Sequence, residues 1–277
     1  MRFFRPLLAT LACTFAGSLT LPLVAADPYQ SSTDFAKYAM KLREDALSKI
    51  QPQVVLPSTS TYGGLYGNGG YPWKRNIVTT TFWIGEDAGQ NNPVDNIKSS
   101  WDVNWKANYG GTDNPDPSAR SNFIPVGFTP RQNPFYIALP YNDVVSHRAH
   151  KPEAKFVIPW FRRAYREPGR SVCKGRWLAI RKGNRIAFAQ WEDCGPFRTD
   201  HWQYIFGNER PVWNLNKGAG LDVSPAVRDY LGMKSSDVCD WKFVEFRDVP
   251  PGPWARHGDN NPFVQNARRT VERVAEK

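Results

Sequence analysis

The sequence predicts a mainly β domain with short helices, a long loop insert and helical extensions at both ends. Three observations support this prediction. Short runs of β-branched and aromatic residues alternate with Gly, Pro and Asn, as strands and turns do. Helical periodicity is confined to segments near the two ends and to one short segment between strands. Residues 90–132 form a stretch rich in Asn, Asp, Pro and Gly, and a loop of that length is usually functional.

The N-terminus has the order of a secretory signal peptide. Arg2 and Arg5 supply positive charge, residues 7–23 form an apolar run, and residues 24–26 are small. We therefore expect a signal peptide over residues 1–26, cleaved near Ala26, and a mature chain that is secreted or periplasmic.

Two alternatives remain for this segment. It could be an uncleaved anchor, although Pro22 and the small residues at the cleavage position favour removal. It could instead carry a lipid on Cys13, although Thr10-Leu11-Ala12 is a poor match to a lipoprotein signal. No later segment has the ~20 apolar residues of a membrane span, so we expect no transmembrane segment in the mature chain.

Composition indicates a folded, basic protein. Hydrophobic residues make up 41% and aromatic residues 14%, including 11 Trp, which is enough for a real core. The formal charge is +10; without Arg2 and Arg5, 34 basic residues face 26 acidic ones, a charge of +8. Such a charge favours anionic partners, among them peptidoglycan, teichoic acids and acidic polysaccharide. The sequence has no nucleic-acid-binding motif, so we expect no nucleic acid, and we expect a monomer.

The first third of the mature chain divides into four segments. Residues 32–50 have helical periodicity, and residues 58–71 are rich in Gly, Ser and Tyr, so we assign 27–72 to an N-terminal helix and a linker. Residues 77–85 are the first predicted strand, and the insert 90–132 follows it.

Further strands and helices follow the insert. Residues 135–139 predict a strand, 156–161 form a short apolar run, and 176–191 predict a hairpin that turns at 182–184. The remaining elements are a helix over 224–231, a strand over 241–246 and a charged helix over 266–276. Ser224 is placed to cap the first of these helices, with Pro225 at its first position and Gly232 after its end. The main domain is therefore expected over 73–254 and a helical tail over 255–277.

Two carboxylates lie in settings that suit catalysis. Asp193 lies in Trp-Glu-Asp-Cys-Gly-Pro-Phe, where a strand runs into a turn. Asp222 lies in Leu-Asp-Val-Ser-Pro, at the entrance to a short helix. An acid held rigidly beside an apolar wall has a raised pKa, as a general acid needs.

The order of these motifs resembles the six-stranded double-psi β-barrel of the rare lipoprotein A family. That family has Asp-Arg-Gly-Pro-Phe and then Ile-Asp-Leu-Ser before a short helix; the matching pieces here are Asp193 to Phe197 and Leu221 to Ser224. Expansins and barwin-related endoglucanases have a similar pair of motifs. Residues 79–83, Thr-Thr-Thr-Phe-Trp, are similar to the first strand of expansins, and residues 243–250 are similar to their closing strand.

The resemblance implies roles for particular residues. Asp222 matches the general acid of the endoglucanases, and Asp193 matches an important Asp of the lipoprotein A enzymes, which are lytic transglycosylases of peptidoglycan. Candidate substrate-binding residues in the matching strands and motifs are Thr80, Trp83, Tyr141 and Trp191. No metal or cofactor is expected.

The chain also departs from these families. Residues 136–143 have no His where the lipoprotein A family has one before its Leu-Pro pair. Endoglucanases place an Asp at the end of the first strand, whereas here Ile84-Gly85 is followed by Glu86 and Asp87.

Other chemically distinctive residues have simpler interpretations. Cys173, Cys194 and Cys239 allow one disulfide, for which we favour Cys173–Cys194, and a catalytic thiol is the less favoured alternative. His147 and His150 lack the companions of a metal site. Most of the aromatic residues are expected in the core, and one or two of the following could stack on sugars: Trp101, Trp105, Tyr109, Trp160 and Trp202.

Together these inferences predict an exported cell-envelope protein that binds cell-wall glycan and is a candidate to cleave it, with Asp222 as the acid. The first alternative is a non-catalytic, expansin-like module that binds or loosens wall polysaccharide. The second is an inhibitor or structural envelope protein that keeps the barrel without its groove.

Overall fold

The computed structural model describes residues 41, 70–90 and 92–275. The predicted signal peptide and the linker over 58–69 lie outside the described residues, as does all but Lys41 of the predicted helix over 32–50. Within the part from residue 70 onward, no helix is long and apolar enough to cross a bilayer.

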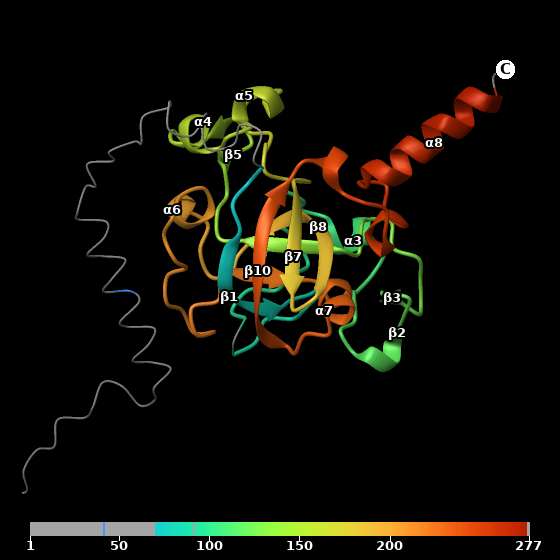
Figure 1. The fold of residues 1–277 in the computed structure, drawn as a ribbon, viewed down its shortest axis with the longest axis horizontal. Helices are drawn as coiled ribbons and strands as arrows, with labels where there is room; N and C mark the ends of the chain where they lie inside the picture. The colour runs from blue at the N-terminus through green and yellow to red at the C-terminus, as the bar shows by residue number, and fades with distance from the viewer. Residues whose placement is uncertain (1–40, 42–69, 91, 276–277) are drawn as a thin grey trace, which may run out of the picture. The chain divides into compact units, whose positions relative to one another are not determined.

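Six strands close into a barrel (Figure 1). Their order around the barrel is β1 (Lys74–Thr81), β10 (Ser236–Val244), β7 (Trp177–Lys182), β8 (Arg185–Cys194), β4 (Tyr136–Leu139) and β9 (Leu221–Val223). The pairs β1–β9 and β4–β8 are parallel, and the other neighbours are antiparallel. Closure leaves no unpaired sheet edge among these strands. The prediction of a mainly β fold with a few short helices is confirmed.

The hairpin β7–β8 forms where the sequence predicts it. Lys182 pairs with Arg185, so the connection is the two-residue turn Gly183-Asn184. Gly183 has a φ of +56°, which the tight turns of two-residue hairpins require and which glycine adopts without strain. The turn sets the register that carries β8 down to Asp193.

Alternating side chains of the long strands fill the barrel. On β10 the buried residues Cys239, Trp241 and Phe243 are separated by partly exposed ones, as the two-residue period of a strand requires. The indole Nε1 of Trp241 donates a hydrogen bond to the Tyr204 hydroxyl at 2.8 Å, so burying this ring leaves no unpaired polar group.

Strand β4 is buried on both faces. Ile137 and Leu139 belong to the large cluster inside the barrel, whereas Tyr136 and Ala138 belong to a second cluster with Phe82, Ile84, Trp105 and Tyr109. The second cluster consists of residues that follow β1 and of the helix α3 (Trp105–Tyr109). The insert therefore covers the outer face of β4, which explains why all four residues of β4 are apolar or aromatic.

The helix before β10 is specified by local chemistry. In α7 (Pro225–Leu231) the Ser224 hydroxyl accepts a hydrogen bond from the Val227 N–H at 3.3 Å, and Pro225 occupies the first position. Gly232 ends the helix with a φ of +65°. All three features were predicted from the sequence, and they are confirmed.

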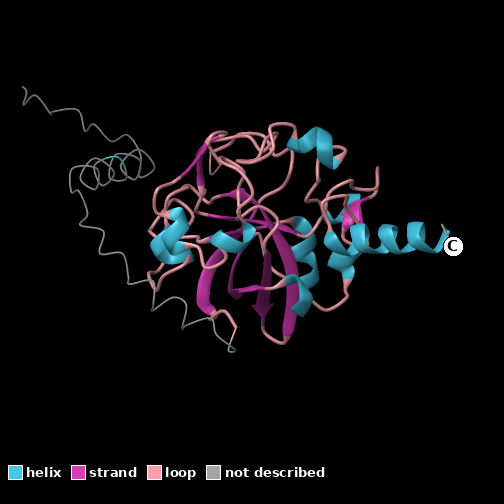
Figure 2. Cartoon of the chain, turned by 90° about the horizontal axis from the view of Figure 1, so that it is seen from above, coloured by secondary structure: helices cyan, strands magenta, loops and turns pink. Residues whose placement is uncertain are grey.

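The remaining helices are short and lie around the barrel (Figure 2). They are α4 (Ala154–Val157), α5 (Phe161–Ala164), α6 (Trp202–Ile205), the 3₁₀ turns η1 (Pro117–Ala119), η2 (Phe246–Asp248) and η3 (Pro253–Ala255), and the longer α8 (Pro262–Ala275). The predicted apolar run over 156–161 thus belongs to α4 and α5. At the start of α8, Phe263 packs edge-on against Trp177 and Phe246, with ring centroids 5.9 and 4.8 Å apart.

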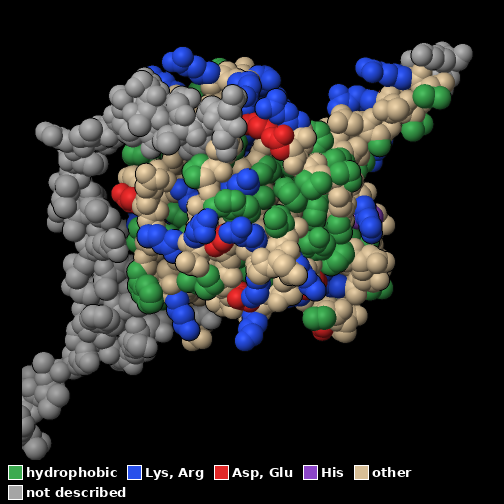
Figure 3. Space-filling model, in the orientation of Figure 1, with side chains coloured by type: hydrophobic (Ala, Val, Ile, Leu, Met, Phe, Trp, Pro, Cys, Tyr) green, Lys and Arg blue, Asp and Glu red, His purple; other side chains and the backbone are tan. Residues whose placement is uncertain are grey.

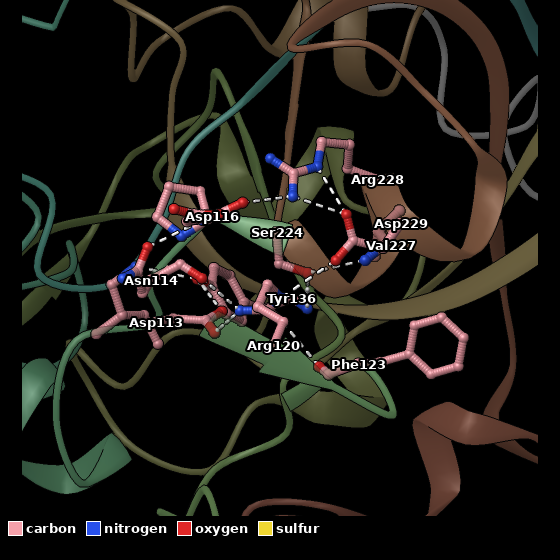
Figure 4. A network of polar contacts seen from close by, with 12 residues as sticks. Asp113, Asn114, Asp116, Arg120, Phe123, Tyr136, Ser224, Val227, Arg228 and Asp229 are labelled. Atoms are coloured by element: carbon pink, nitrogen blue, oxygen red, sulfur yellow. Dashed lines mark hydrogen bonds and ion pairs between the residues drawn. The ribbon is translucent and has the colours of Figure 1, made fainter. Parts of the chain in front are cut away.

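A buried polar network fixes the insert to the barrel (Figure 4). Arg120 forms ion pairs with Asp113 and, at 3.1 Å, with Asp229 of α7, and both Arg120 and Asp113 are almost completely buried. Asp113 also accepts a hydrogen bond from the Tyr136 hydroxyl at 2.9 Å. The network connects the insert, β4 and α7, so it holds in place the helix that follows Asp222.

Strand β1 ends earlier than the sequence suggests. It stops at Thr81, and the chain turns at Ile84-Gly85, where Gly85 has a φ of +80°. A Cβ on Gly85 would lie 2.7 Å from the Thr112 hydroxyl oxygen, so the turn needs glycine for space as well as for conformation. After the turn, Asn96 lies beside Gly85 and Glu86, because the Gly85 N–H donates to the Asn96 carbonyl at 2.8 Å and the Asn96 N–H donates to the Glu86 carbonyl at 2.9 Å.

Candidate active site

A groove of about 950 Å³ lies where β1, β8 and β9 meet the first part of the insert. We call it the carboxylate groove. Its acidic lining residues are Glu86, Asp87, Asp95, Asp193 and Asp222. Residues 92–96 and 98–100 of the insert form one wall, and residues 194–199, at and after the end of β8, form another. The insert thus contributes directly to the groove.

Asp222 is the central residue of β9. Its neighbours Leu221 and Val223 are fully buried and point into the barrel, so the alternation of the strand turns Asp222 outward into the groove. Thr80, its partner across the parallel pair β1–β9, donates a hydrogen bond from its hydroxyl to Asp222 Oδ1. A Cβ on Gly195 would lie 3.5 Å from Asp222 Oδ2, so glycine there leaves room beside the carboxyl group.

The environment of Asp222 favours its protonated form. Burial raises the pKa of Asp222 to about 7; the negative charges of Glu86 and Asp193 raise it as well, and the hydrogen bond from Thr80 lowers it. A carboxyl group with such a pKa holds its proton below neutral pH and can transfer it to a ligand.

Asp193 lies near the end of β8 and is only 8% exposed. Its Oδ1 accepts a hydrogen bond from the backbone N–H of Ser100 at 2.7 Å, which joins the strand to the insert. Burial raises the pKa of Asp193 to about 6, and hydrogen bonds from Ser100 and Cys194 oppose the rise. Asp193 is therefore a second carboxyl group of the groove that holds a proton more readily than an ordinary aspartate.

The two aspartates are related through a single residue of β4. Ala138 pairs with Asp222 on its antiparallel side and with Asp193 on its parallel side. Because neighbouring strands lie ~4.8 Å apart, the two aspartate Cα atoms are about 10 Å apart across β4. Both side chains line the carboxylate groove, so the structure brings the two predicted catalytic residues together.

Glu86 is a third carboxyl group in the groove that the sequence did not identify as a site residue. Its Oε2 accepts a hydrogen bond from Asn96 Nδ2 at 2.9 Å. Burial raises the pKa of Glu86 to about 7, and hydrogen bonds from the backbone near Trp83 and from Asn96 oppose the rise. One feature of the sequence could have identified Glu86 as a site residue: it lies just after the first predicted strand, where endoglucanases have an Asp.

The candidate substrate-binding residues have different locations. Thr80 lines the groove, but Trp83 is half-buried and does not line it. Tyr141 and Trp191 are completely buried, and Trp191 stacks on Phe243 with ring centroids 5.9 Å apart. The indole Nε1 of Trp191 donates to the Asp193 backbone carbonyl at 2.7 Å. Trp191 therefore holds the backbone at Asp193 from the barrel interior. Neither Tyr141 nor Trp191 is accessible to a ligand.

The aromatic residues proposed for sugar stacking are mostly internal. Trp105, Tyr109 and Trp160 are buried, and Trp101 and Trp202 are half-buried. The exposed tryptophan is Trp213, at 69%, in the loop that also brings Asn216 to the groove.

Trp213 sits on an ordered loop. The Asn214 side chain oxygen accepts hydrogen bonds from the backbone N–H groups of residues 216, 218 and 219. A Cβ on Gly218 would lie 3.6 Å from the Trp213 ring, so the ring rests against the loop. No local pattern distinguished this tryptophan from the ten others, because exposure depends on the path of the loop.

The expected disulfide is absent. Cys173, Cys194 and Cys239, the cysteines within the described part of the chain, are all free thiols. Cys194 donates a weak hydrogen bond to the Tyr141 carbonyl at 3.2 Å, and burial raises the pKa of both Cys173 and Cys194 well above the ordinary value. Such thiols are poor nucleophiles.

The described residues contain no group of three or more His, Cys, Asp or Glu side chains placed to hold a metal ion. His150 lies 3.7 Å from Asp143, and its Nε2 contacts the Arg170 carbonyl oxygen at 2.9 Å. His147 is exposed.

No protein-family model matches this chain, and no curated protein matches it either. What the groove can do chemically follows from its side chains: three carboxyl groups with raised pKa values, one of them bound to a hydroxyl group.

Proposed function

We propose that this chain is an exported cell-envelope protein whose carboxylate groove binds cell-wall glycan and cleaves it, with Asp222 as the general acid. One observation carries the proposal: Asp222 faces the groove with a pKa of about 7 and a hydrogen bond from Thr80. The order of Asp193 to Phe197 and Leu221 to Ser224, which resembles lytic transglycosylases, supports the choice of substrate.

The barrel is proposed to be of the double-psi type. The support is its mixed strand order, in which two parallel pairs, β1–β9 and β4–β8, are set among antiparallel neighbours. This arrangement also determines where the two aspartates lie: Asp193 is on β8, a strand of one parallel pair, and Asp222 is on β9, a strand of the other.

The proposed reaction uses one carboxyl group twice. Protonated Asp222 gives its proton to the glycosidic oxygen as the bond between that oxygen and the anomeric carbon breaks. A hydroxyl group of the same sugar then bonds to the anomeric carbon and returns its proton to the Asp222 carboxylate. The products are an anhydro-sugar end and a free hydroxyl end, and no water is consumed.

The neighbouring side chains have proposed supporting roles. The Thr80 hydroxyl orients the Asp222 carboxyl group through its hydrogen bond. Asp193 and Glu86 raise the pKa of Asp222 by their negative charge. Trp213 offers an exposed aromatic face, suited to a pyranose ring, at the loop beside the groove.

The test is incubation of the purified protein with glycan strands stripped of peptide, followed by mass spectrometry of soluble products. Anhydro-sugar ends are the expected result. Reducing ends formed by water, without anhydro-sugars, would contradict the lytic reaction and favour hydrolysis with Glu86 as base. Binding to insoluble wall without any product would favour the non-catalytic, expansin-like module, and neither binding nor products would favour the inhibitor or structural role.

A further inference from the structure

A second groove lies beside the first, and its charged lining residues are basic, whereas those of the first are mainly acidic. It has a volume of about 910 Å³, and its cationic lining residues are Arg166, Arg170, Lys174 and Arg176, with His147 beside them. No Asp or Glu lines it. We call it the basic groove. Figure 3 shows Lys and Arg side chains near α4 and α5 and at other places on the same face.

The walls of the basic groove are held together by close packing. The strand β5 (Val144–Ser146) and the turn after it form one wall, and residues 164–176 form the other. Gly169 has a φ of +71°, and a Cβ there would lie 2.2 Å from the His147 carbonyl carbon. Beneath them, the buried Asp143 accepts a hydrogen bond from the Val172 N–H at 2.7 Å without itself lining the groove.

The cations of the basic groove are only partly neutralised. The exposed Lys174 acts on the carboxyl groups of Asp102 and Glu192 through its charge, and neither of these residues lines the groove. Arg166 donates to two backbone carbonyls, which orient its guanidinium without cancelling its charge. Arg170 has a single, exposed carboxylate partner, Glu167, at 3.5 Å, and such a pair is weak in water.

Arg176 is the fixed cation of the groove. Its guanidinium lies 4.1 Å from the Trp160 ring and donates to Glu245 at 3.0 Å, while its Nε is buried without a hydrogen-bond partner among the described residues. Because this Nε is buried and Glu245 pairs the charge, Arg176 shapes the wall of the groove, and the exposed Arg166, Arg170 and Lys174 supply its accessible positive charge.

One residue connects the two grooves. Ser100 lines both, and its N–H is the donor that holds Asp193. A chain-like ligand that passes Ser100 therefore meets carboxyl groups on one side and guanidinium and ammonium groups on the other. The carboxylate groove has Lys98 and Arg198 beside five acidic residues, whereas the basic groove has no acidic residue, so an anionic group is favoured in the basic groove.

We propose that the basic groove binds an anionic group, carboxylate or phosphate, carried by the same glycan chain that lies in the carboxylate groove. This inference rests on the proposed function and specifies its substrate: an acidic wall polymer that is uncharged at the cleaved bond and anionic beyond Ser100. Arginine forks match carboxylate and phosphate oxygens equally well, so both sources share this chemistry.

The test is a binding measurement with uncleaved polymers on the full-length protein and on the double variant Lys174→Gln/Arg170→Gln. The probes are polygalacturonate, which carries carboxylates, a glycerol-phosphate teichoic acid, and a neutral dextran of similar length. The matched control is Arg247→Gln/Arg273→Gln, which removes the same charge from exposed positions outside both grooves. Cleavage of short, uncharged glycan strands is measured separately.

The double variant should bind at least one of the acidic polymers about tenfold more weakly than the wild type, a loss that shrinks as salt is added. Dextran binding, cleavage of uncharged strands and the control variant should be unchanged. The polymer affected identifies whether carboxylate or phosphate is bound.

Two results would overturn the inference. One is equal binding of every polymer by the wild type and the double variant. The other is a loss confined to phosphatidylglycerol vesicles, tested as a fourth probe with the same variants, which would assign the basic groove to a membrane surface. A third result separates the two proposals. If the wild type cleaves no glycan but the double variant binds acidic polymer more weakly than the wild type, the proposed catalysis is wrong and the proposed binding by the basic groove is supported.

Discussion

Asp193 and Asp222 flank the same residue, Ala138, on opposite sides of β4 and face one groove. Their pKa values are raised to about 6 and about 7, in each case mainly by burial. Both carboxyl groups are therefore protonated more readily near neutral pH than an ordinary aspartate. The strands of the closed barrel, which pair Ala138 with both residues, keep the two aspartates in position.

Activity should fall as the pH rises through about 7, because the general acid must carry a proton. Replacing Glu86 with Gln removes a negative charge that raises the pKa of Asp222, so the alkaline limb of the pH–rate profile should move to lower pH. Asp87→Asn, at an exposed position of the same groove, is the control and should leave the limb in place. An alkaline limb that stays fixed in Glu86→Gln would refute the coupling.

Removing the Thr80 hydroxyl should have the opposite effect. The hydrogen bond from Thr80 lowers the pKa of Asp222, so Thr80→Val should raise it by about one unit and shift the alkaline limb upward. Thr81→Val is a matched control, because the Thr81 hydroxyl is buried and has no hydrogen-bond partner among the described residues. Carbon-detected NMR titration of the aspartate side chains measures the shift; identical titrations in both variants would contradict it.

Glu192 should make the protein less stable at neutral pH than at pH 5. It is 2% exposed, and burial raises its pKa to about 7, against the opposing effects of Lys174 and the hydrogen bond from Asn260. A carboxyl group whose pKa is raised on folding stabilises most below its unfolded pKa, and that stability is lost as the pH rises through about 7.

Glu192→Gln should therefore raise the free energy of unfolding at pH 7.5 by about 2–3 kcal/mol and change it little at pH 5. The lowered pKa values of His201 and His257 act in the opposite direction, equally in both proteins. Urea denaturation at the two pH values measures the difference, with the exposed Glu167→Gln as control. A uniform effect at both pH values would show that the pKa of Glu192 is not the cause.

The network that holds the insert should contribute strongly to stability. Asp113→Asn leaves Arg120 buried without its main counter-charge, so we expect a loss of about 3–5 kcal/mol in the free energy of unfolding. Asp248→Asn breaks an exposed ion pair of 3.9 Å to Arg247 and should change stability by less than about 0.5 kcal/mol. Similar small losses in both variants would mean that the network is not important for folding.

Much of the fold could be predicted because its strongest signals are local. Ser224, Pro225 and Gly232 specify α7 by capping, and Gly183 specifies the hairpin turn. Strand β9 has only three residues, which is too short for any periodic pattern, so the sequence alone did not reveal it as a strand.

The site could be predicted only in part. The motifs identified Asp193 and Asp222, and the structure places both in one groove. Glu86 joins them because the chain turns at Gly85 and lies there against Asn96 of the insert, a path that depends on long-range packing. Tyr141 and Trp191 resemble sugar-binding residues in type, but the face of the sheet that a side chain occupies depends on tertiary packing, and both are buried.

The most direct test of the account is the rate at which anhydro-sugar products form from glycan strands with wild-type protein and with Asp222→Asn. Asn keeps the size of the side chain and its hydrogen-bonding capacity but cannot donate a proton as an acid. We expect the variant to bind glycan as the wild type does and to form products about 10²–10⁴-fold more slowly. Products formed at the wild-type rate by Asp222→Asn would contradict it.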